Sequence, residues 1–345
     1  MKYQFGFVLS CVLVMMGCQS SPSKPLSSNH QSESQKSLVA PNDDLRHFYG
    51  VGFGMTELEA QNDALSKVAT RISTSVESKT QSSLTVVSKN KSETIDRSFQ
   101  NKINTQSKKI DFANIRVVDK QKFDNGTQIL VSVDRQALIN SYQNKIESTS
   151  LELNHDFKLY QATSAFNKLL SEDALLTKLA TLDSYVQIMQ VLKPQYNKSA
   201  IDKVAQAIYQ SIKDHKESVQ FKVKNDRQSS AFARLLAEKI AFEGYSVVDS
   251  AQVPTSNTIT ISVTTKVTPF NFKTTNPQYA NLIMVDRLTS YQIEDGQGQR
   301  KNLYNGAIKT RGISSKSQES AIQDSKPYKK ILNKSTIIEF LAQHQ

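Results

Sequence analysis

The chain has 345 residues, a formal net charge of +11 and two cysteines, Cys11 and Cys18. Both cysteines lie at the very start, so a packed core rather than disulfides or a Cys-ligated metal must stabilise the remainder. The length allows two domains of ordinary size. The excess of basic residues favours phospholipid headgroups, lipopolysaccharide or cell wall over nucleic acid as partners. The alternative is that the lysines are scattered on solvated faces and bind no partner.

The first residues have the pattern of an export signal. A positively charged start precedes an apolar run over residues 5–16, which is shorter than the ~20 residues of a membrane span. The run ends in Met-Met-Gly-Cys at positions 15–18, which resembles a bacterial lipoprotein box. We therefore expect a signal peptide over residues 1–17, cleavage after Gly17, and lipid attachment, with palmitate among the acyl chains, at Cys18. An ordinary cleaved signal is the alternative.

Residues 18–44 are predicted to be the lipidated cysteine and a flexible linker. The segment after Cys18 is rich in serine and has three prolines, so it cannot bury a core. Its r.m.s. reach is about 30 Å. Gln19 stands where many inner-membrane lipoproteins of Gram-negative bacteria have aspartate. This favours the outer membrane, with the body facing the periplasm.

Folding is expected to begin at residue 45. Thr56 and Glu59 form a capping box at the start of a helix, and apolar residues recur at helical spacing as far as Ile72. The alternation from Ile72 to Ser78 predicts that the helix passes into a strand. A second helix is expected near 94–108.

A hairpin follows in the sequence. Two alternating runs, Ile115–Lys122 and Thr127–Val133, flank an Asp-Asn-Gly turn at residues 124–126, and Asn-Gly is a strong hairpin signal. A helix that runs into the next region is then expected to open at Asp134-Arg135.

Gly50, Gly52 and Gly54 alternate just before the first predicted helix. A dinucleotide fold requires G-x-G-x-x-G and an acidic residue about 20 positions later, and neither is present. We interpret the glycines as a structural turn that lets a strand and a helix pack closely. No nucleotide and no cofactor is expected.

The order of these motifs resembles the LPP20 lipoprotein family. The motifs are, in order, Gly-Val-Gly-x-Gly from Gly50, Glu59-Ala60 with Ala64 and Ala69, Ile72-x3-Val76-x-Ser78, and Ile-Leu-Val-Ser-Val-Asp-Arg over 129–135. The resemblance covers roughly residues 45–147. The resemblance implies a helix packed on a sheet, a structural or assembly role, and no catalytic residues. The family includes flagellum-associated outer-membrane lipoproteins.

Residues 148–216 are predicted to be a helical segment. One helix is expected over Phe157–Leu170, a second from an N-cap at Ser171 to a stop at Pro194, and a third from Ser199. We expect their apolar stripes to form the core of a small bundle; partner surfaces are the alternative.

Residues 217–345 alternate as a β-α-β-β-β-β-α domain, with Ser229 or Ser230 capping the first helix and Gly244 ending it. The fold class is therefore α+β. We expect two domains, each a helix on an antiparallel sheet, joined by the small helical segment.

The sequence contains no catalytic or metal-binding motif. The five histidines are isolated in the chain, so a zinc site is not expected. No nucleophile elbow is present. Lysines cluster in four places, where contact with an anionic surface is the alternative to solvated faces: Lys89/Lys91, Lys108/Lys109, Lys120/Lys122 and Lys326/Lys329/Lys330.

These features predict a non-enzymatic outer-membrane lipoprotein that acts as a scaffold in the cell envelope, for example in a flagellar or secretion apparatus. Envelope proteins and the membrane itself are its expected partners, and nucleic acid is not. A binding module for cell wall or lipopolysaccharide is the main alternative. A hydrolase whose site is assembled only in space is the third hypothesis.

Overall fold

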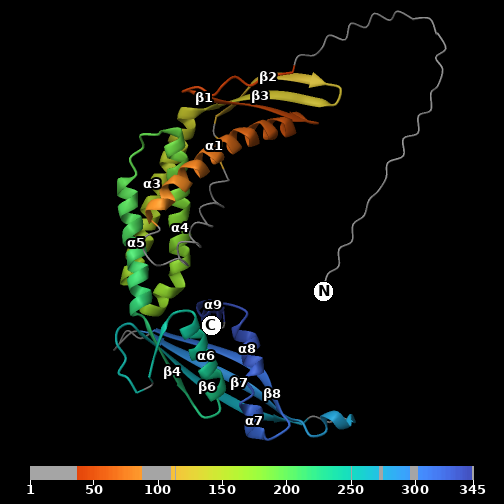
Figure 1. The fold of residues 1–345 in the computed structure, drawn as a ribbon, viewed down its shortest axis with the longest axis vertical. Coiled ribbons are helices and arrows are strands. Elements are labelled where there is room, and N and C mark those ends of the chain that lie inside the picture. The colour runs from red at the N-terminus through yellow and green to blue at the C-terminus, as the bar shows by residue number, and fades with distance from the viewer. Residues whose placement is uncertain are drawn as a thin grey trace, which may run out of the picture. The chain divides into compact units, whose positions relative to one another are not determined.

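A computed structural model describes residues 37–87, 110–112, 114–249, 251–271, 275–295 and 302–343. Gly17, Cys18, most of the linker and the helix expected near 94–108 lie outside these residues. The described residues from Leu38 onwards form one compact unit. The predicted α+β class is confirmed, with two separate sheets (Figure 1). Among the helices of the described part, none is long and apolar enough to cross a membrane.

The first sheet has three antiparallel strands in the order β1-β3-β2. Helix α1 covers one of its faces (Figure 1). The predicted hairpin is confirmed, because Phe123 pairs with Gly126 across the turn. The elements are β1 (His47–Gly54), α1 (Glu57–Val87), β2 (Ile115–Phe123) and β3 (Gly126–Asp134).

The strand expected from Ile72 to Ser78 is wrong, because α1 continues to Val87. Ile72 and Val76 are both buried and stand four residues apart, so they lie on one face of the helix. The polar residues between them do not break it. The hydroxyl of Ser75, for example, donates to the carbonyl of Arg71 one turn earlier, at 2.9 Å.

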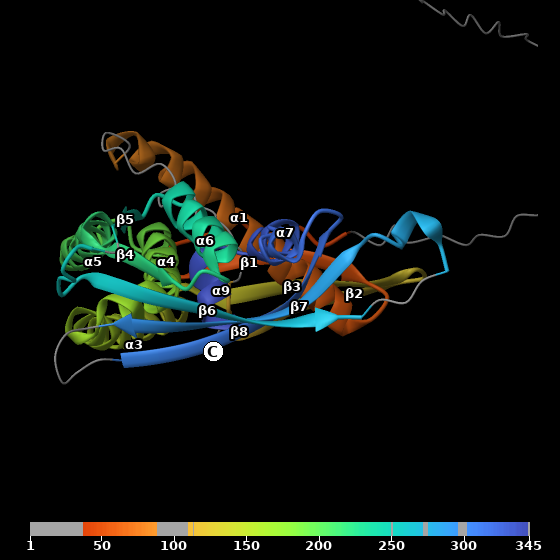
Figure 2. The same ribbon diagram turned by 90° about the horizontal axis from the view of Figure 1, so that it is seen from below.

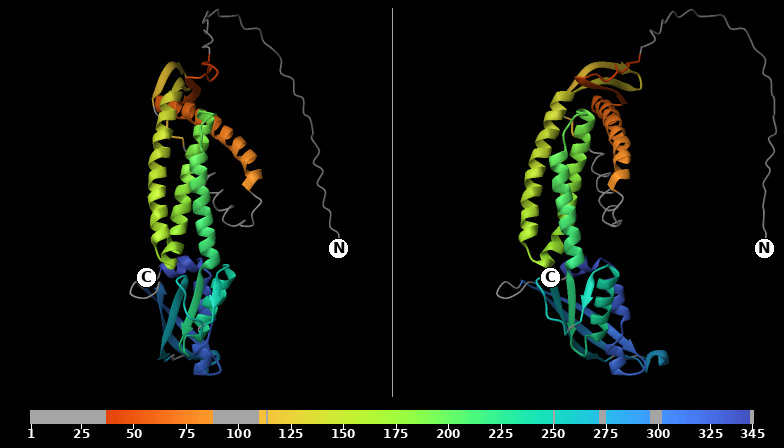
Figure 3. Two further views of the ribbon diagram at one scale, coloured as in Figure 1. Left: turned by 90° about the vertical axis from the view of Figure 1, so that its left-hand side faces the viewer. Right: turned by 60° about the vertical axis from the view of Figure 1, so that its left-hand side comes forward.

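Three long helices lie side by side after the first sheet (Figures 1 and 3). They are α3 (Arg135–Ala162), α4 (Ala165–Leu192) and α5 (Ser199–Ser218). Helix α3 begins at Arg135 as predicted, and Asp134 caps it, accepting from the amide of Ala137 at 2.9 Å. The expected boundary between residues 147 and 148 falls inside α3.

Two predicted boundaries in this bundle are wrong. The helix expected over Phe157–Leu170 is interrupted at Thr163 and Ser164, between α3 and α4. Ser171 lies inside α4, where its hydroxyl donates to the carbonyl of Asn167 at 2.8 Å and caps nothing. The prediction that the apolar stripes form the core is confirmed by five buried residues: Leu175, Leu179, Leu182, Val186 and Met189.

The second sheet has five strands in the order β5-β4-β6-β7-β8. The expected antiparallel sheet is in fact mixed, since β4 runs parallel to both β5 and β6. A helical crossover between β4 and β5 returns the chain in the same direction, which produces a parallel pair. The strands are β4 (Gln220–Asn225), β5 (Ser246–Val248), β6 (Thr258–Phe270), β7 (Ile283–Asp295) and β8 (Asn302–Ser314).

Helices cover one face of this second sheet. Figure 2 shows α6, α7 and α9 on the same side of the strands. Ser229 is the N-cap of α6, and Gly244 follows its C-cap with φ +88°, both as predicted. The helices are α6 (Ser230–Phe242), α7 (Gln318–Ile322), α8 (Lys326–Leu332) and α9 (Ile337–Gln343), with a short 3-10 turn at Pro277–Tyr279.

The start of α4 is buried against the second sheet. The amide of Phe166 donates to a carboxylate oxygen of Asp295 at 2.7 Å, and Asp295 is fully buried. The ring of Phe166 packs edge-on against Tyr304 at 5.0 Å, and the Tyr304 hydroxyl donates to the side-chain oxygen of Asn167 at 2.7 Å. The first turns of α4 therefore belong to the core of the second sheet, while the rest of the bundle packs in a core of its own.

Replacing Asp295 by alanine should destabilise the protein, because it leaves a buried amide at the positive end of α4 without its acceptor. We expect a loss of about 1–3 kcal/mol in the free energy of unfolding, measured by urea titration. Asp214→Ala is the control, since exposed Asp214 bonds only to neighbouring Gln210 in the described structure. Equal midpoints for both variants would remove the structural role of Asp295.

Candidate functional site

The three glycines of β1 face helix α1. A Cβ atom added at Gly52 would lie 2.0 Å from the carbonyl oxygen of Ala60, and one added at Gly50 would lie 2.5 Å from that of Ala64. A Cβ at Gly54 would lie 2.5 Å from the amide nitrogen of Ala60. The backbone of the helix thus touches the backbone of the strand. It occupies the space that a bound phosphate would need.

Replacing Gly52 by alanine should force α1 away from β1. We expect a loss of at least about 3 kcal/mol, at the upper end of overpacking costs, seen as a lowered thermal midpoint. Gly244→Ala is the comparison, because nothing lies within 4 Å of its Cβ position and only a backbone cost of about 1–2 kcal/mol applies. A Gly52 variant as stable as the Gly244 variant would contradict this packing.

The free edge of β1 is occupied by side chains from α1. Asp63 accepts from the amide of Phe53 at 2.9 Å, and Lys67 donates to the carbonyl of Val51 at 3.0 Å. The hydrogen bond from Lys67 is the main cause that lowers the pKa of Asp63 below its usual value.

Asp43 and Arg71 occupy the same edge further along β1. The carboxylate of Asp43 accepts from the amide of Tyr49 at 2.8 Å, and Arg71 donates to the Tyr49 carbonyl. The two side chains also pair with each other at 3.0 Å. Side chains in these positions prevent an additional strand from pairing with β1.

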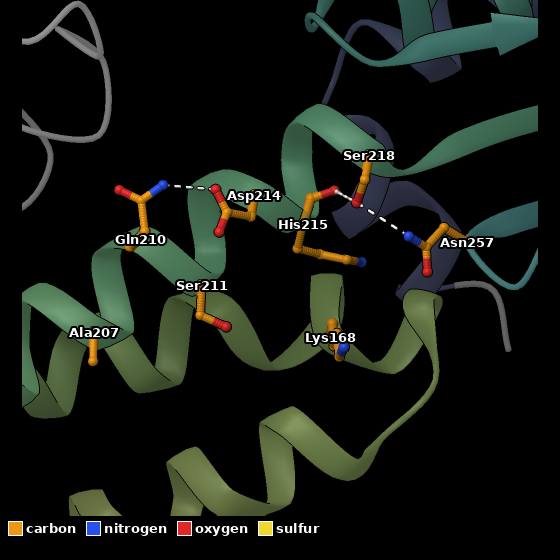
Figure 4. A pocket seen from close by; sticks show the side chains of 8 residues that line it. All are labelled: Lys168, Ala207, Gln210, Ser211, Asp214, His215, Ser218 and Asn257. Carbon is orange, nitrogen blue, oxygen red and sulfur yellow. Dashed lines mark hydrogen bonds between the residues drawn. The ribbon is translucent and has the colours of Figure 1, made fainter.

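A shallow groove of about 510 Å³ lies between α4 and α5 (Figure 4). In Figure 4 most of its lining side chains project from one helix, α5, while Lys168 projects from α4. The lining residues are Lys168, Ala207, Gln210, Ser211, Asp214, His215, Ser218 and Asn257.

A buried pair of polar side chains lies at the end of this groove. Nδ1 of His215 is 3.1 Å from Oε1 of Glu172, and each residue is only 6% exposed. Nζ of Lys216 is 3.3 Å from the other oxygen of the same carboxylate. The pair connects α4 to α5. The sequence gives no local signal for a contact between Glu172 and His215, because the two residues stand 43 positions apart.

The pair does not have the arrangement of a hydrolytic triad. The hydroxyl of Ser218 donates to the backbone carbonyl of His215, at 3.2 Å, and accepts from Asn257 (Figure 4). Within the described ranges no hydroxyl bonds to the imidazole, and its Nε2 has no hydrogen-bond partner. We therefore interpret the Glu172–His215 pair as a structural contact between α4 and α5.

Tyr160 lies beside the pair, with its ring edge-on to His215 at 6.3 Å. Burial raises the pKa of the Tyr160 hydroxyl, and the negative charge of Glu172 raises it further. Lys168 lies over the opposite part of the same ring, 5.8 Å from its centre.

The raised pKa of Tyr160 predicts a loss of stability in alkali. The folded state resists ionisation of this hydroxyl, so its contribution is present below pH ~10, the unfolded pKa of tyrosine, and is lost as the pH rises towards the folded pKa. Unfolding free energies between pH 9 and pH 11 should fall less steeply for Tyr160→Phe than for the wild type. Parallel curves would contradict the shift.

The structure separates the predicted lysine clusters. Lys120 pairs with Glu57, whereas Lys122 is exposed. Lys326, Lys329 and Lys330 are exposed on α8, and no ion pair involves them in the part of the chain that is described. The clusters Lys89/Lys91 and Lys108/Lys109 lie outside the described residues.

Histidine and acidic side chains do not converge on a common point. In the described residues, no group of three or more His, Cys, Asp or Glu side chains could hold a metal ion.

Comparisons with known proteins give only distant similarities. No protein-family model and no curated protein matches the chain, so the LPP20 resemblance stays a prediction. A secreted protein, HP1454 from Helicobacter pylori, is similar at 11% identity over 74% of this chain and 88% of its own, with a TM-score of 0.40. The rare lipoprotein B from Shewanella oneidensis is similar at 11% identity over 36% of this chain and 91% of its own, with a TM-score of 0.20. These values assign the chain to neither protein's family.

Proposed function

We propose that this chain is a lipid-anchored protein of the Gram-negative envelope, held at the outer membrane by acylated Cys18 and facing the periplasm. The observation that carries the proposal is the position of Cys18, directly after a short apolar run and before a serine-rich linker. Several acyl chains on one residue, at about 0.8 kcal/mol per buried CH₂, make a permanent anchor.

The body acts in this proposal as a non-enzymatic scaffold. Two observations support a structural role: its one compact unit from residue 38 onwards, and the use of the Glu172–His215 pair to connect helices. The resemblance of residues 45–147 to the LPP20 family favours an assembly role, for example in a flagellar or secretion apparatus. The expected partners are other envelope proteins.

The anchor can be tested by fractionation of cells that express the full chain. Cys18→Ser should move the protein from the membrane fraction to the soluble periplasmic fraction, because serine does not accept the diacylglycerol group. Cys11→Ser is the matched control, since Cys11 lies inside the apolar run and its loss should leave the protein in the membrane. Unchanged membrane association of Cys18→Ser would refute the anchor.

A second candidate function is binding to anionic cell wall or lipopolysaccharide. It is favoured by three exposed lysines of the second sheet, Lys224, Lys266 and Lys309, none of which forms an ion pair among the described residues.

A further inference from the structure

The second sheet has one open face. Ile261, Tyr291 and Ile308 point into the core that α6, α8 and α9 cover, so the alternate residues of the same strands point the other way. Figure 2 shows the labelled helices of this region on the core side. Among the described residues, the side chains on this face are exposed or half-exposed on β7, on β8 and on β6 from Ser262 onwards, whereas Thr258 and Thr260 at the start of β6 are buried. We call the exposed part the open face.

Two rows of small polar side chains cross this open face. Strand register places Ser262 beside Gln292 and Gln292 beside Asn305; in the next row, Thr264 lies beside Ser290 and Ser290 beside Ala307. Together they line a shallow trough of about 570 Å³. We call it the open trough, and its six defining residues are Ser262, Thr264, Ser290, Gln292, Asn305 and Ala307.

The hydrogen-bonding groups of the open trough are largely unused. Gln292 donates to the side-chain oxygen of Asn305 at 3.3 Å, whereas the hydroxyls of Ser262, Thr264 and Ser290 have no partner in the described structure. A hydroxyl both donates and accepts, and an amide group offers both functions. Such a surface matches the hydroxyl groups of a sugar.

Three unpaired lysines surround the open trough. Lys224 lies beside Ser262 in the strand register, and Lys266 and Lys309 flank Leu288 in the adjacent row. All three are exposed, and none has an ion pair among the described residues. Asp286, by contrast, is neutralised by Arg311, whose Nε lies 2.7 Å from its carboxylate. In the row beyond Gln292, Glu294 lies between Thr260 and Leu303 and adds one negative charge. Three lysines against this one carboxylate leave the margin of the trough net positive among the described residues, which suits a negatively charged partner.

The same residues argue against other occupants. A single-stranded nucleic acid requires aromatic rings for its bases to stack on, but Tyr291 is only 2% exposed because its ring points into the core. A typical protein partner buries a central apolar patch. Here the exposed apolar side chains, Leu288 and Leu303, lie apart in the two rows that border the trough, and the side chains of its floor carry hydroxyl, amide and methyl groups.

We propose that the open trough binds an anionic glycan. The sugar hydroxyls bond to Ser262, Ser290 and Gln292, and carboxylate or phosphate groups on the glycan pair with Lys224, Lys266 and Lys309. This site goes beyond the scaffold role and does not depend on the anchor at Cys18.

The test uses the full chain with Cys18→Ser, so that the protein is soluble and the anchor plays no part. Its probe is delipidated, phosphorylated core oligosaccharide of lipopolysaccharide, titrated by calorimetry at low and moderate salt. We expect binding that weakens with salt and falls at least ten-fold in the double variant Lys266→Gln/Lys309→Gln. Ala307→Tyr, which fills the trough at an exposed position, should have a similar effect without a change of charge.

The matched control is Lys329→Gln/Lys330→Gln, which removes the same charge from α8 on the core side of the sheet and should change affinity less than two-fold. Neutral dextran tests the need for charge, and inorganic phosphate tests the need for sugar. Absence of binding, equal losses in the two double variants, or equal binding of phosphate alone would each overturn the proposal. None of these results would affect the fractionation test of Cys18.

Discussion

The buried contact between Asp295 and the first turn of α4 is the constraint on which the rest of the body depends. The carboxylate accepts from the amide of Phe166, and the Phe166 side chain belongs to the same core as Phe221 and Ile261 of the second sheet. A helix N-terminus carries a partial positive charge and amides without an acceptor in the helix. A buried aspartate there balances the charge and accepts from one of these amides. The bundle and the second sheet are joined through apolar burial, this capped amide and the hydrogen bond from Tyr304 to Asn167. Any contact made by the open trough is thereby connected to the remainder of the chain.

The two sheets present different surfaces to a partner. On the first sheet, glycines allow α1 to lie directly on one face of β1, and the side chains of Asp63, Lys67 and Arg71 occupy the free edge of the same strand. That edge is closed to an added strand. The second sheet, by contrast, has an open face whose small polar side chains leave room and whose marginal lysines leave charge uncompensated. The groups that could bind a partner are therefore found mainly on the second sheet.

Local signals predicted the elements well, and long-range contacts explain the errors. Asn125-Gly126 predicted the hairpin, Asp134-Arg135 predicted the start of α3, and Gly244 predicted the end of α6. Each of these signals acts on residues next to it in the chain. The alternation after Ile72 predicted a strand, yet hydroxyls such as that of Ser75 bond back to the helix and leave the apolar face intact. The parallel pairing of β4, the buried pair Glu172–His215 and the open trough all join residues that are distant in the sequence. The trough also requires the register of three strands, which no single-strand pattern contains.

In the proposed function, one modified sulfur, that of Cys18, attaches the compact body to a bilayer. The most direct test is the mass of the N-terminal peptide of the mature protein isolated from membranes. The account predicts that this peptide begins at Cys18 and carries a thioether-linked diacylglycerol. A mature chain that begins elsewhere, or one with an unmodified Cys18, would contradict it.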